Sequence, residues 1–310
     1  MEGLPSGVAL FVVTVFALQA NLVFTQDIFG GVVEEDTILD LSGSPYTVNA
    51  TIIVERNASL LIEPGVELRF DPGVGMLING ALMVNGSETQ RVTLTANIPL
   101  SSSSSPYSWL GIRWLPGAAS VTEYVDLLPI TRSQSVLRYA DVTGAGALFL
   151  PGAAPSPPGL TSMPEANDDL QPGGTGPALE ADDIAPVLHN VYVGGNFGSG
   201  VEWRYITNVA EITDCEISNN AGVGLSFTLI SGIGKLSLDG SVVGENDGHG
   251  INAEIYPPTD DVLDLPRHTF CSSEMDLEDA FYLDHNAADF IDDPYQCLQV
   301  RKAVKRDPVV

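Results

Sequence analysis

Basic residues are scarce in this sequence. Its 310 residues include 13 lysines and arginines against 40 aspartates and glutamates, so the formal net charge is −27. Proteins that bind nucleic acids gather lysine and arginine around the phosphates, and an acidic excess of this size excludes nucleic acid as a partner. The chain is not a disordered acidic segment either, because 44% of its residues are hydrophobic and such segments contain few aliphatic residues.

Cysteine is also rare, with only Cys215, Cys271 and Cys297 in the chain. So few cysteines do not make a disulfide framework, and the fold must therefore depend on its hydrophobic core. Cys271 and Cys297 lie in one polar segment, and we predict that they form a disulfide. Cys215 is then the odd cysteine, which we interpret as a small buried side chain rather than a reactive thiol.

Apolar runs long enough to cross a membrane are missing after the N-terminal region. Val8 to Ala20 is almost wholly apolar and is followed by polar residues, which is typical of the central part of a secretory signal peptide. The run is short for a membrane span, although an uncleaved anchor is the alternative interpretation. We predict a signal peptide over residues 1–25 and a secreted chain or the ectodomain of a cell-surface protein.

Export gives meaning to three Asn-x-Ser/Thr sequons that lie close together in the N-terminal part of the chain. Each of them falls at a predicted turn, where a glycan would extend into solvent. We predict N-glycosylation at one or more of the three sites, which are Asn49, Asn57 and Asn85.

Short apolar runs alternate with turn residues from Thr51 onward. Runs such as 59–63 and 66–70 have the period-two alternation of β-strands. The pairs between the runs, including Pro64-Gly65 and Asn79-Gly80, favour tight turns. No window of this stretch has a convincing helical period of apolar residues, so we predict an all-β fold here.

A six-residue pattern returns three times in the C-terminal half. It reads Asn-x-Gly-x-Gly followed by an aliphatic residue, and its copies begin at Asn196, Asn220 and Asn246. An alternating, strand-like stretch precedes each copy. A repeat of this length with three short strands is typical of a parallel β-helix, in which each coil brings the chain back above its start. A β-sandwich with glycine-rich hairpins is the alternative, but it does not explain why the pattern returns in phase.

Equivalent residues of successive coils stack in such a fold. Stacked asparagines can form a ladder of hydrogen bonds and tolerate left-handed backbone at a tight bend, while glycines free the backbone at the same corner. We predict a structural ladder that contains Asn196, Asn220, Asn246, Gly198, Gly222 and Gly248.

These patterns divide the chain into parts. The β-helix is predicted over residues 26–264, with a loop insertion at 151–183, where proline, glycine, serine and acidic residues break the strand pattern. Residues 265–310 lack the repeat, so we predict a cap on the open end of the coil or the start of a further domain. Within this last part, residues 276–284 are interpreted as a short acidic helix or loop.

The repeats resemble the right-handed β-helices of the pectin-lyase-like superfamily. The first coils look more specifically like the opening of the bark beetle (anakonda) type of animal proteins, through Glu63-Pro-Gly65, Asp71-Pro-Gly73 and Trp109-x-Gly-Ile112. Those proteins are large, extracellular and membrane-anchored, act at epithelial cell contacts and contain several β-helix units. The resemblance covers roughly residues 30–253 and implies a right-handed coil. It also implies that any membrane attachment comes through a missing downstream part of a longer protein.

Catalysis would need residues that the repeat does not already explain. Gly248-His249-Gly250 matches part of a polygalacturonase signature, but the repeat accounts for both glycines and the other elements of that signature are missing. Glycoside hydrolysis also needs two facing carboxyl groups, and most acidic pairs fall in predicted loops. We therefore assign no catalytic residue. The arginines of the later coils belong to no recognisable motif; they are Arg113, Arg132, Arg138 and Arg204.

Two kinds of ligand site are candidates. A calcium site would use carboxylates on or near successive coils, although no known calcium-loop spacing is present; these are Asp214, Asp239 and Asp247. A carbohydrate platform would use aromatic side chains, which in strands belong to the core more often; these are Trp109, Trp114, Trp203 and Tyr205. Metal ligands remain unassigned. We expect no cofactor, and calcium is the one alternative that we consider.

The sequence favours a non-enzymatic extracellular β-helix module. It would act in cell contact, adhesion or matrix organisation by binding an extracellular protein or a glycan. The alternative is a polysaccharide lyase or a glycoside hydrolase of the pectin-lyase-like type, because many right-handed β-helices have these activities.

Overall fold

The computed structural model describes residues 28–97, 108–125, 128–146, 176–230, 235–256, 275–277, 282–284 and 288–292. Within these ranges the chain is almost entirely β-structure, and the one helical element is a 3-10 helix at Leu41–Gly43 (η1). No helix among the described residues has the length and apolar character that a membrane span requires. The predicted signal peptide at 1–25 and the predicted disulfide between Cys271 and Cys297 lie outside the described residues.

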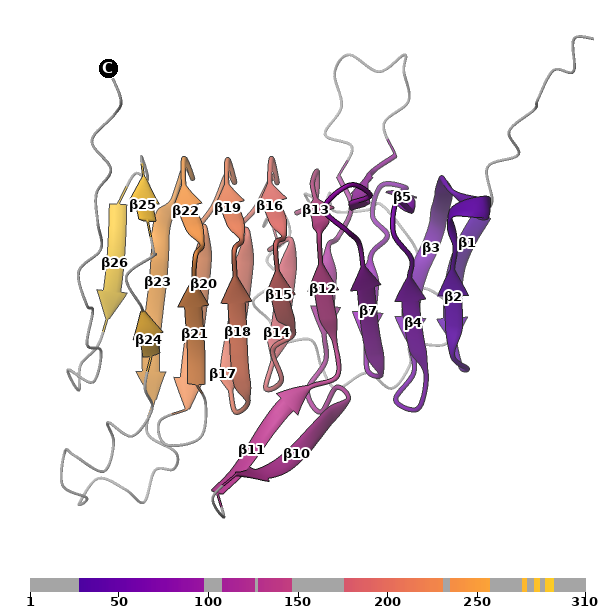
Figure 1. The fold of residues 1–310 in the computed structure, drawn as a ribbon. Coiled ribbons are helices and arrows are strands. Elements are labelled where there is room, and N and C mark those ends of the chain that lie inside the picture. Colours follow the sequence, from indigo (N-terminus) through magenta and orange to yellow (C-terminus); the bar gives the residue numbers. More distant parts are fainter. Residues whose placement is uncertain are drawn as a thin grey trace, which may run out of the picture.

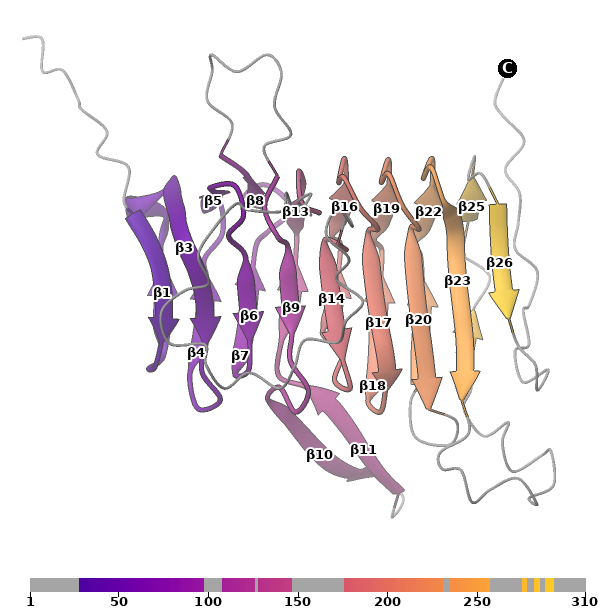
Figure 2. The same ribbon diagram turned by 180° about the vertical axis from the view of Figure 1, so that it is seen from behind.

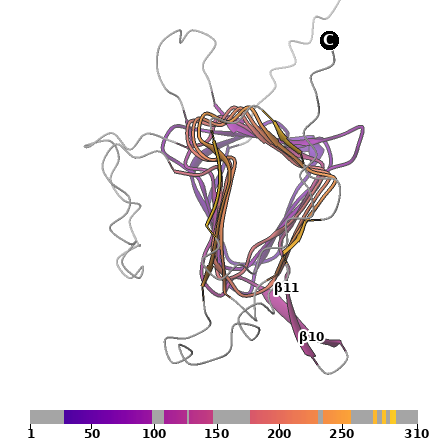
Figure 3. The ribbon, with the colours of Figure 1, turned by 90° about the vertical axis from the view of Figure 1, so that its left-hand side faces the viewer.

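The strands stack in parallel coils that have three faces, as the view along the coil shows (Figure 3). Face 1 is an eight-stranded sheet of β2 (Thr37–Leu39), β4 (Ser59–Ile62), β7 (Ala81–Asn85), β12 (Val136–Arg138), β15 (Val187–His189), β18 (Val209–Thr213), β21 (Lys235–Asp239) and β24 (Met275–Leu277). Figure 1 looks onto this face.

Faces 2 and 3 form one larger sheet, because β3 (Tyr46–Val54) bends from one face to the other. Face 2 contains the first half of β3 and then β5 (Glu67–Phe70), β8 (Val92–Ala96), β13 (Ala140–Val142), β16 (Tyr192–Gly194), β19 (Glu216–Ser218), β22 (Val242–Gly244) and β25 (Tyr282–Asp284). Face 3, seen in Figure 2, contains the second half of β3, β6 (Met76–Ile78), β9 (Ile112–Trp114), β14 (Leu179–Asp182), β17 (Val201–Ile206), β20 (Leu225–Ile230), β23 (His249–Tyr256) and β26 (Ala288–Asp292). β1 (Ile28–Val33) pairs with both halves of β3 and so passes from face 2 to face 3 with it.

The fold is therefore all-β and solenoid-like, with a nearly closed cross-section. Within each face, neighbouring strands are equivalent strands of successive coils and pair in parallel. Alternate side chains point inward, so apolar residues of successive coils meet in one continuous core. On face 3, Trp114, Ala181, Trp203 and Phe227 occupy the same inward register position. Small Ala181 separates the two indoles, and both tryptophans are completely buried.

The ladder glycines have a different role from the one that the sequence analysis gave them. The left-handed residue at the corner between faces 2 and 3 is the one directly before each ladder asparagine, with φ of 66° at Gly195, 57° at Asn219 and 53° at Glu245. Neither Gly222 nor Gly248 has a positive φ.

Close approach between coils explains these glycines instead. A Cβ on Gly248 would lie 2.7 Å from the carbonyl carbon of Gly222, and a Cβ on Gly222 would lie 2.8 Å from the backbone nitrogen of Ser199. Any side chain at these positions would push successive coils apart.

The boundaries of the coil also differ from the predicted ones. The loop insertion predicted at 151–183 ends too late, because β14 pairs with β9 and β17 as part of face 3; residues 151–175 lie outside the described ranges. The coil does not end at 264 either, since β24, β25 and β26 pair with β21, β22 and β23. The short acidic helix or loop predicted at 276–284 is wrong where the structure describes it, at 275–277 and 282–284, because both segments are strands.

An antiparallel hairpin is the main departure from the coil. β10 (Ser120–Val125) pairs with β11 (Leu128–Ser133) between β9 and β12, and the hairpin projects outward (Figures 1 and 3). The Arg132 guanidinium forms an ion pair with the Glu211 carboxylate of β18, which ties the hairpin to face 1. The sequence analysis did not anticipate this element.

Cys215 lies in the core at the corner between faces 1 and 2. Its Sγ accepts a hydrogen bond from the Val191 backbone N–H at 3.4 Å, and its own backbone N–H donates to Ser241 Oγ at 3.1 Å. Burial raises the pKa of the thiol to about 12. A protonated, inaccessible thiol reacts slowly with electrophiles, since the thiolate is the nucleophile.

We predict that the native protein leaves Cys215 unlabelled by iodoacetamide at mildly alkaline pH, while the urea-unfolded protein is labelled there. The other two cysteines are replaced by serine, and labelling is followed by peptide mass spectrometry. Labelling of the native protein at the rate of the unfolded one would contradict the buried position of the thiol.

Candidate functional site

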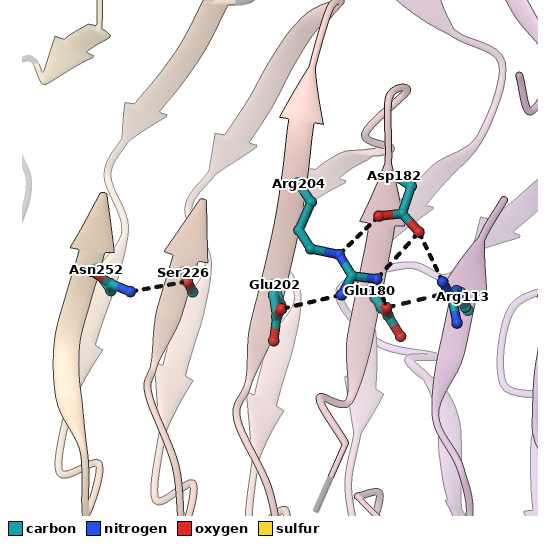
Figure 4. A network of polar contacts seen from close by, with 7 residues as sticks. All are labelled: Arg113, Glu180, Asp182, Glu202, Arg204, Ser226 and Asn252. Atoms are coloured by element: carbon teal, nitrogen blue, oxygen red, sulfur yellow. Dashed lines mark hydrogen bonds and ion pairs between the residues drawn. The ribbon is translucent and has the colours of Figure 1, made fainter. Parts of the chain in front are cut away.

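Five charged side chains gather on the outer surface of face 3 (Figure 4). We call them the face-3 cluster; they are Arg113 on β9, Glu180 and Asp182 on β14, and Glu202 and Arg204 on β17. Three consecutive coils contribute to it, and the residues come from parts of the chain that are far apart in sequence.

Strand register explains why these residues meet. Glu180 pairs with Arg113 on one side and with Glu202 on the other, while Asp182 pairs with Arg204. Because side chains alternate across a strand, the charged residues point outward while the tryptophans and small residues between them point into the core.

The two arginines bind the carboxylates between them. Arg204 Nε donates to Asp182 Oδ1 at 2.8 Å, and Arg113 Nη2 donates to Asp182 Oδ2 at 3.0 Å. Arg204 Nη2 also donates to Glu180 Oε1. Glu180 Oε1 lies 3.6 Å from Arg113 Nε, and Glu202 Oε1 lies 3.7 Å from Arg204 Nη1. The shared contacts fix all five side chains relative to one another.

The cluster is partly desolvated. The side chains of Glu180 and Asp182 are only 16% and 15% exposed. Burial raises the pKa of Glu180 above its ordinary value, and the positive charges of Arg113 and Arg204 oppose that shift. The pKa of Arg204 is also raised: burial acts to lower it, but the hydrogen bond to Asp182 and the negative charges of the three carboxylates outweigh that effect.

Because the pKa of Glu180 is raised, the free energy of unfolding should depend on pH. The folded protein holds the Glu180 proton more tightly than the unfolded chain, so this stabilising contribution is present below the ordinary pKa of 4.5 and is lost as pH rises through the raised value. We expect Glu180→Gln to remove this loss, so that the variant gains stability relative to the wild type as pH rises. Urea unfolding at a series of pH values measures the difference.

Glu67→Gln is the matched control, because Glu67 also pairs with an arginine, Arg69, but on face 2 and with greater exposure. If the stability of wild type and Glu180→Gln changed in parallel with pH, the proposed environment of Glu180 would be wrong.

Polar side chains continue the same outward column beyond the cluster. Ser226 on β20 pairs with Glu202, and Asn252 on β23 pairs with Ser226. Asn252 Nδ2 donates weakly to Ser226 Oγ at 3.5 Å, while Asn252 Oδ1 is buried and has no hydrogen-bond partner. We call the series Arg113, Glu180, Glu202, Ser226 and Asn252 the face-3 column.

The ladder asparagines lie at the corner between faces 2 and 3, beside this column. Asn196 Nδ2 donates to Asn220 Oδ1 at 2.8 Å, and Asn220 Nδ2 donates to Asn246 Oδ1 at 2.9 Å. Each Nδ2 also donates to a carbonyl of the preceding coil. All three residues are at most 3% exposed. They stabilise the coil from within and are not accessible to a ligand.

The three aspartates proposed as calcium ligands do not form one group, although Asp214 and Asp239 are neighbours in successive coils. Asp214 and Asp239 lie at the corner between faces 1 and 2, whereas Asp247 lies at the corner between faces 2 and 3. Among the residues that the structure describes, no three histidine, cysteine or acidic side chains form a group that could hold a metal ion.

The aromatic platform is excluded by burial. Trp109, Trp114 and Trp203 are all 0% exposed, and only Tyr205 faces solvent, at 55%. Trp109 stacks on Phe70 inside the core, with ring centroids 4.1 Å apart. The three tryptophans are therefore core residues rather than a surface for sugar rings.

The face-3 cluster was not predicted from the sequence. Glu180 and Asp182 were assigned to the loop insertion, and Arg113 and Arg204 belong to no recognisable motif. A usable signal was present, because the residue two positions after the last glycine of the repeat points outward in Gly200-Val-Glu202, Gly224-Leu-Ser226 and Gly250-Ile-Asn252.

Comparison of the chain with models of protein families, with curated proteins and with solved structures finds no match.

Proposed function

We propose that this protein is a non-enzymatic extracellular module that binds a protein or a glycan in cell contact, adhesion or matrix organisation. The face-3 column is the observation that carries the proposal. It presents one hydrogen-bonding or charged side chain per coil on five successive coils. Parallel strands lie about 4.8 Å apart, so the column offers regularly spaced contacts along the coil axis.

An extended polymer laid along the coil suits this arrangement. The side chains at one end of the column are held rigidly by the ion pairs of the face-3 cluster, so ordering them on binding costs little entropy. At the other end, the half-buried side chains of Ser226 and Asn252 supply a hydroxyl and an amide group for hydrogen bonds to the hydroxyl or amide groups of a ligand.

The same proposal includes a right-handed coil of the pectin-lyase-like type and a relationship to bark beetle-type proteins. Parallel strands connected within one sheet favour the right-handed crossover strongly, and the all-parallel pairing supports that choice. The apolar N-terminal run and the three sequons support an extracellular location.

Binding of the secreted protein to a glycan array and to cell surfaces tests the proposal. The variant Arg204→Ala removes the arginine that contacts three carboxylates, and we expect it to weaken binding by about tenfold or more. Arg69→Ala is the matched control on face 2 and should bind like the wild type. Equal binding by both variants, or blank arrays for the wild type, would overturn the face-3 assignment.

The second candidate is a polysaccharide lyase or glycoside hydrolase, and one observation favours it. Glu180, whose pKa is raised by burial, stands two residues from Asp182, which two arginines bind. Two carboxyl groups held close together on one face are the minimum that glycoside hydrolysis requires. Turnover of acidic polysaccharides, measured with and without calcium and abolished by Glu180→Gln, would favour the enzyme over the binding module.

A further inference from the structure

The three sequon asparagines occupy three different corners of the first coils. Asn49 lies where β3 passes from face 2 to face 3, Asn57 lies in the turn from face 3 to face 1, and Asn85 ends β7 before the chain turns to face 2. All three are exposed. The sequence contains no other sequon.

The first coil also carries four exposed, large apolar side chains. Their exposed fractions are 70% for Ile28, 56% for Val32, 61% for Ile38 and 49% for Leu41. Elsewhere in the described residues, the exposed large hydrophobic side chains are Val121 and Tyr124 of the hairpin and Phe197 and Tyr205 of the later coils. The four side chains lie on different sides of the first coil rather than in one contiguous patch. Together they make this end of a strongly acidic protein more apolar, and exposed apolar surface promotes association.

Two of the apolar residues flank the first sequon. In the pairing of β1 with β3, Ile28 lies opposite Thr47 and Val32 lies opposite Ile53. These two partners stand on either side of Asn49 along β3. A glycan on Asn49 therefore starts between the two exposed side chains.

The other two apolar residues lie on face 1 and at the corner that follows it. Ile38 pairs with Leu61 of β4, the strand that begins directly after the turn of Asn57. Leu41 lies at the corner between faces 1 and 2. Asn85 lies at the same corner, two coils further along the chain. A Cβ on Gly65, in the coil between them, would lie 3.4 Å from Leu41 Cδ1 and 3.6 Å from Cβ of Gln90, which follows β7.

We propose that N-linked glycans on Asn49, Asn57 and Asn85 form a collar around the N-terminal coils that covers the four exposed apolar side chains. The collar leaves the face-3 column, which begins at Arg113 on β9, open for ligand. Glycans are bulky and strongly hydrated, so they shield apolar surface that the protein itself does not bury. This inference rests on the extracellular location in the proposed function.

The test uses the full chain secreted from animal cells. Intact mass before and after glycosidase treatment should show glycan at all three sites. We expect the triple variant Asn49→Gln, Asn57→Gln, Asn85→Gln to bind the dye ANS several-fold more than the wild type and to self-associate with concentration. Because the triple variant could fold poorly, wild-type protein deglycosylated after purification provides a second measurement and should give the same increase.

Two controls locate the effect. Ser59→Thr keeps the sequon of Asn57 and should behave like the wild type. Replacing the four apolar residues by polar ones in the glycan-free background should return ANS binding to the wild-type level; the changes are Ile28→Thr, Val32→Thr, Ile38→Thr and Leu41→Gln.

The outcomes separate the collar from the proposed function. An exported protein that carries no glycan, or one whose deglycosylated form stays monomeric and does not bind ANS, would overturn the collar and leave the binding module standing. A chain that is not exported would overturn both. Self-association that persists after the four polar substitutions would also overturn the collar.

Discussion

Asn220→Ala is expected to lower the free energy of unfolding by about 3–4 kcal/mol, since it removes several buried hydrogen bonds at once. Asn220 Nδ2 donates to Asn246 Oδ1 at 2.9 Å and to the Val193 carbonyl at 3.1 Å, and Asn220 Oδ1 accepts from Asn196 at 2.8 Å. The substitution removes one hydrogen bond from each of these partners, which lie in the two neighbouring coils. Urea unfolding followed by circular dichroism measures the loss.

Two further variants identify the cause of the loss. Asn220→Asp keeps the shape but places a carboxylate beside Asn246 Oδ1 and the Val193 carbonyl, so the variant should be strongly destabilised at neutral pH and recover part of its stability in acid. Asn219→Gly changes an exposed neighbour with φ of 57°, a conformation that glycine adopts readily, and should alter stability by no more than about 0.5 kcal/mol. A small effect of Asn220→Ala would show that the ladder contributes little to folding.

Trp203→Ala is expected to destabilise the coil by about 3–5 kcal/mol, which is the usual range for a large aromatic residue in a packed core. Trp203 is fully buried, and it lies between Ala181 and Phe227 in register. Ala181 and Phe227 belong to strands that pair with β17 at this position, so the coil cannot collapse into the space without breaking sheet hydrogen bonds. The free energy of unfolding in urea again measures the effect.

Two matched variants show whether the loss of stability comes from the burial of Trp203 or merely from the removal of an aromatic ring. Trp203→Phe should cost clearly less than the alanine variant, because it keeps most of the apolar volume and removes an indole N–H that has no hydrogen-bond partner. Tyr124→Ala removes an aromatic ring that is 76% exposed in the hairpin and should change stability by about 0.5 kcal/mol or less. Equal losses for Trp203→Ala and Tyr124→Ala would contradict the packing of face 3.

Much of the coil could be predicted because a solenoid repeats its local environment. Each copy of the Asn-x-Gly-x-Gly pattern meets the same corner, so the spacing of Asn196, Asn220 and Asn246 indicates stacked coils with the asparagines in register. The coils without that pattern were harder to recognise. β14 follows a proline- and glycine-rich stretch, and β24 to β26 lack the motif altogether, so both were assigned to other parts of the chain.

The glycines of the repeat lie at the predicted corner, but positive φ is not the reason that Gly222 and Gly248 are needed there. Sequence patterns associate glycine with positive φ, but Gly222 and Gly248 are needed because neighbouring coils approach within van der Waals contact. The positive φ falls instead on Asn219 and Glu245. Asparagine adopts positive φ more readily than glutamate does. Only the stacking of whole coils distinguishes the two reasons.

The sequence by itself determined the all-β character, the coil repeat, the acidic charge and the positions of the sequons, because these depend on local alternation and spacing. The tertiary structure decided which outward residues meet. Arg113 and Asp182 are 69 residues apart, and the segments between the strands of face 3 differ in length, so no fixed spacing relates them. Their contact follows from parallel register, which the packing of the core sets: Trp114 and Ala181 align inside the coil, and Arg113 and Glu180 align outside it for the same reason.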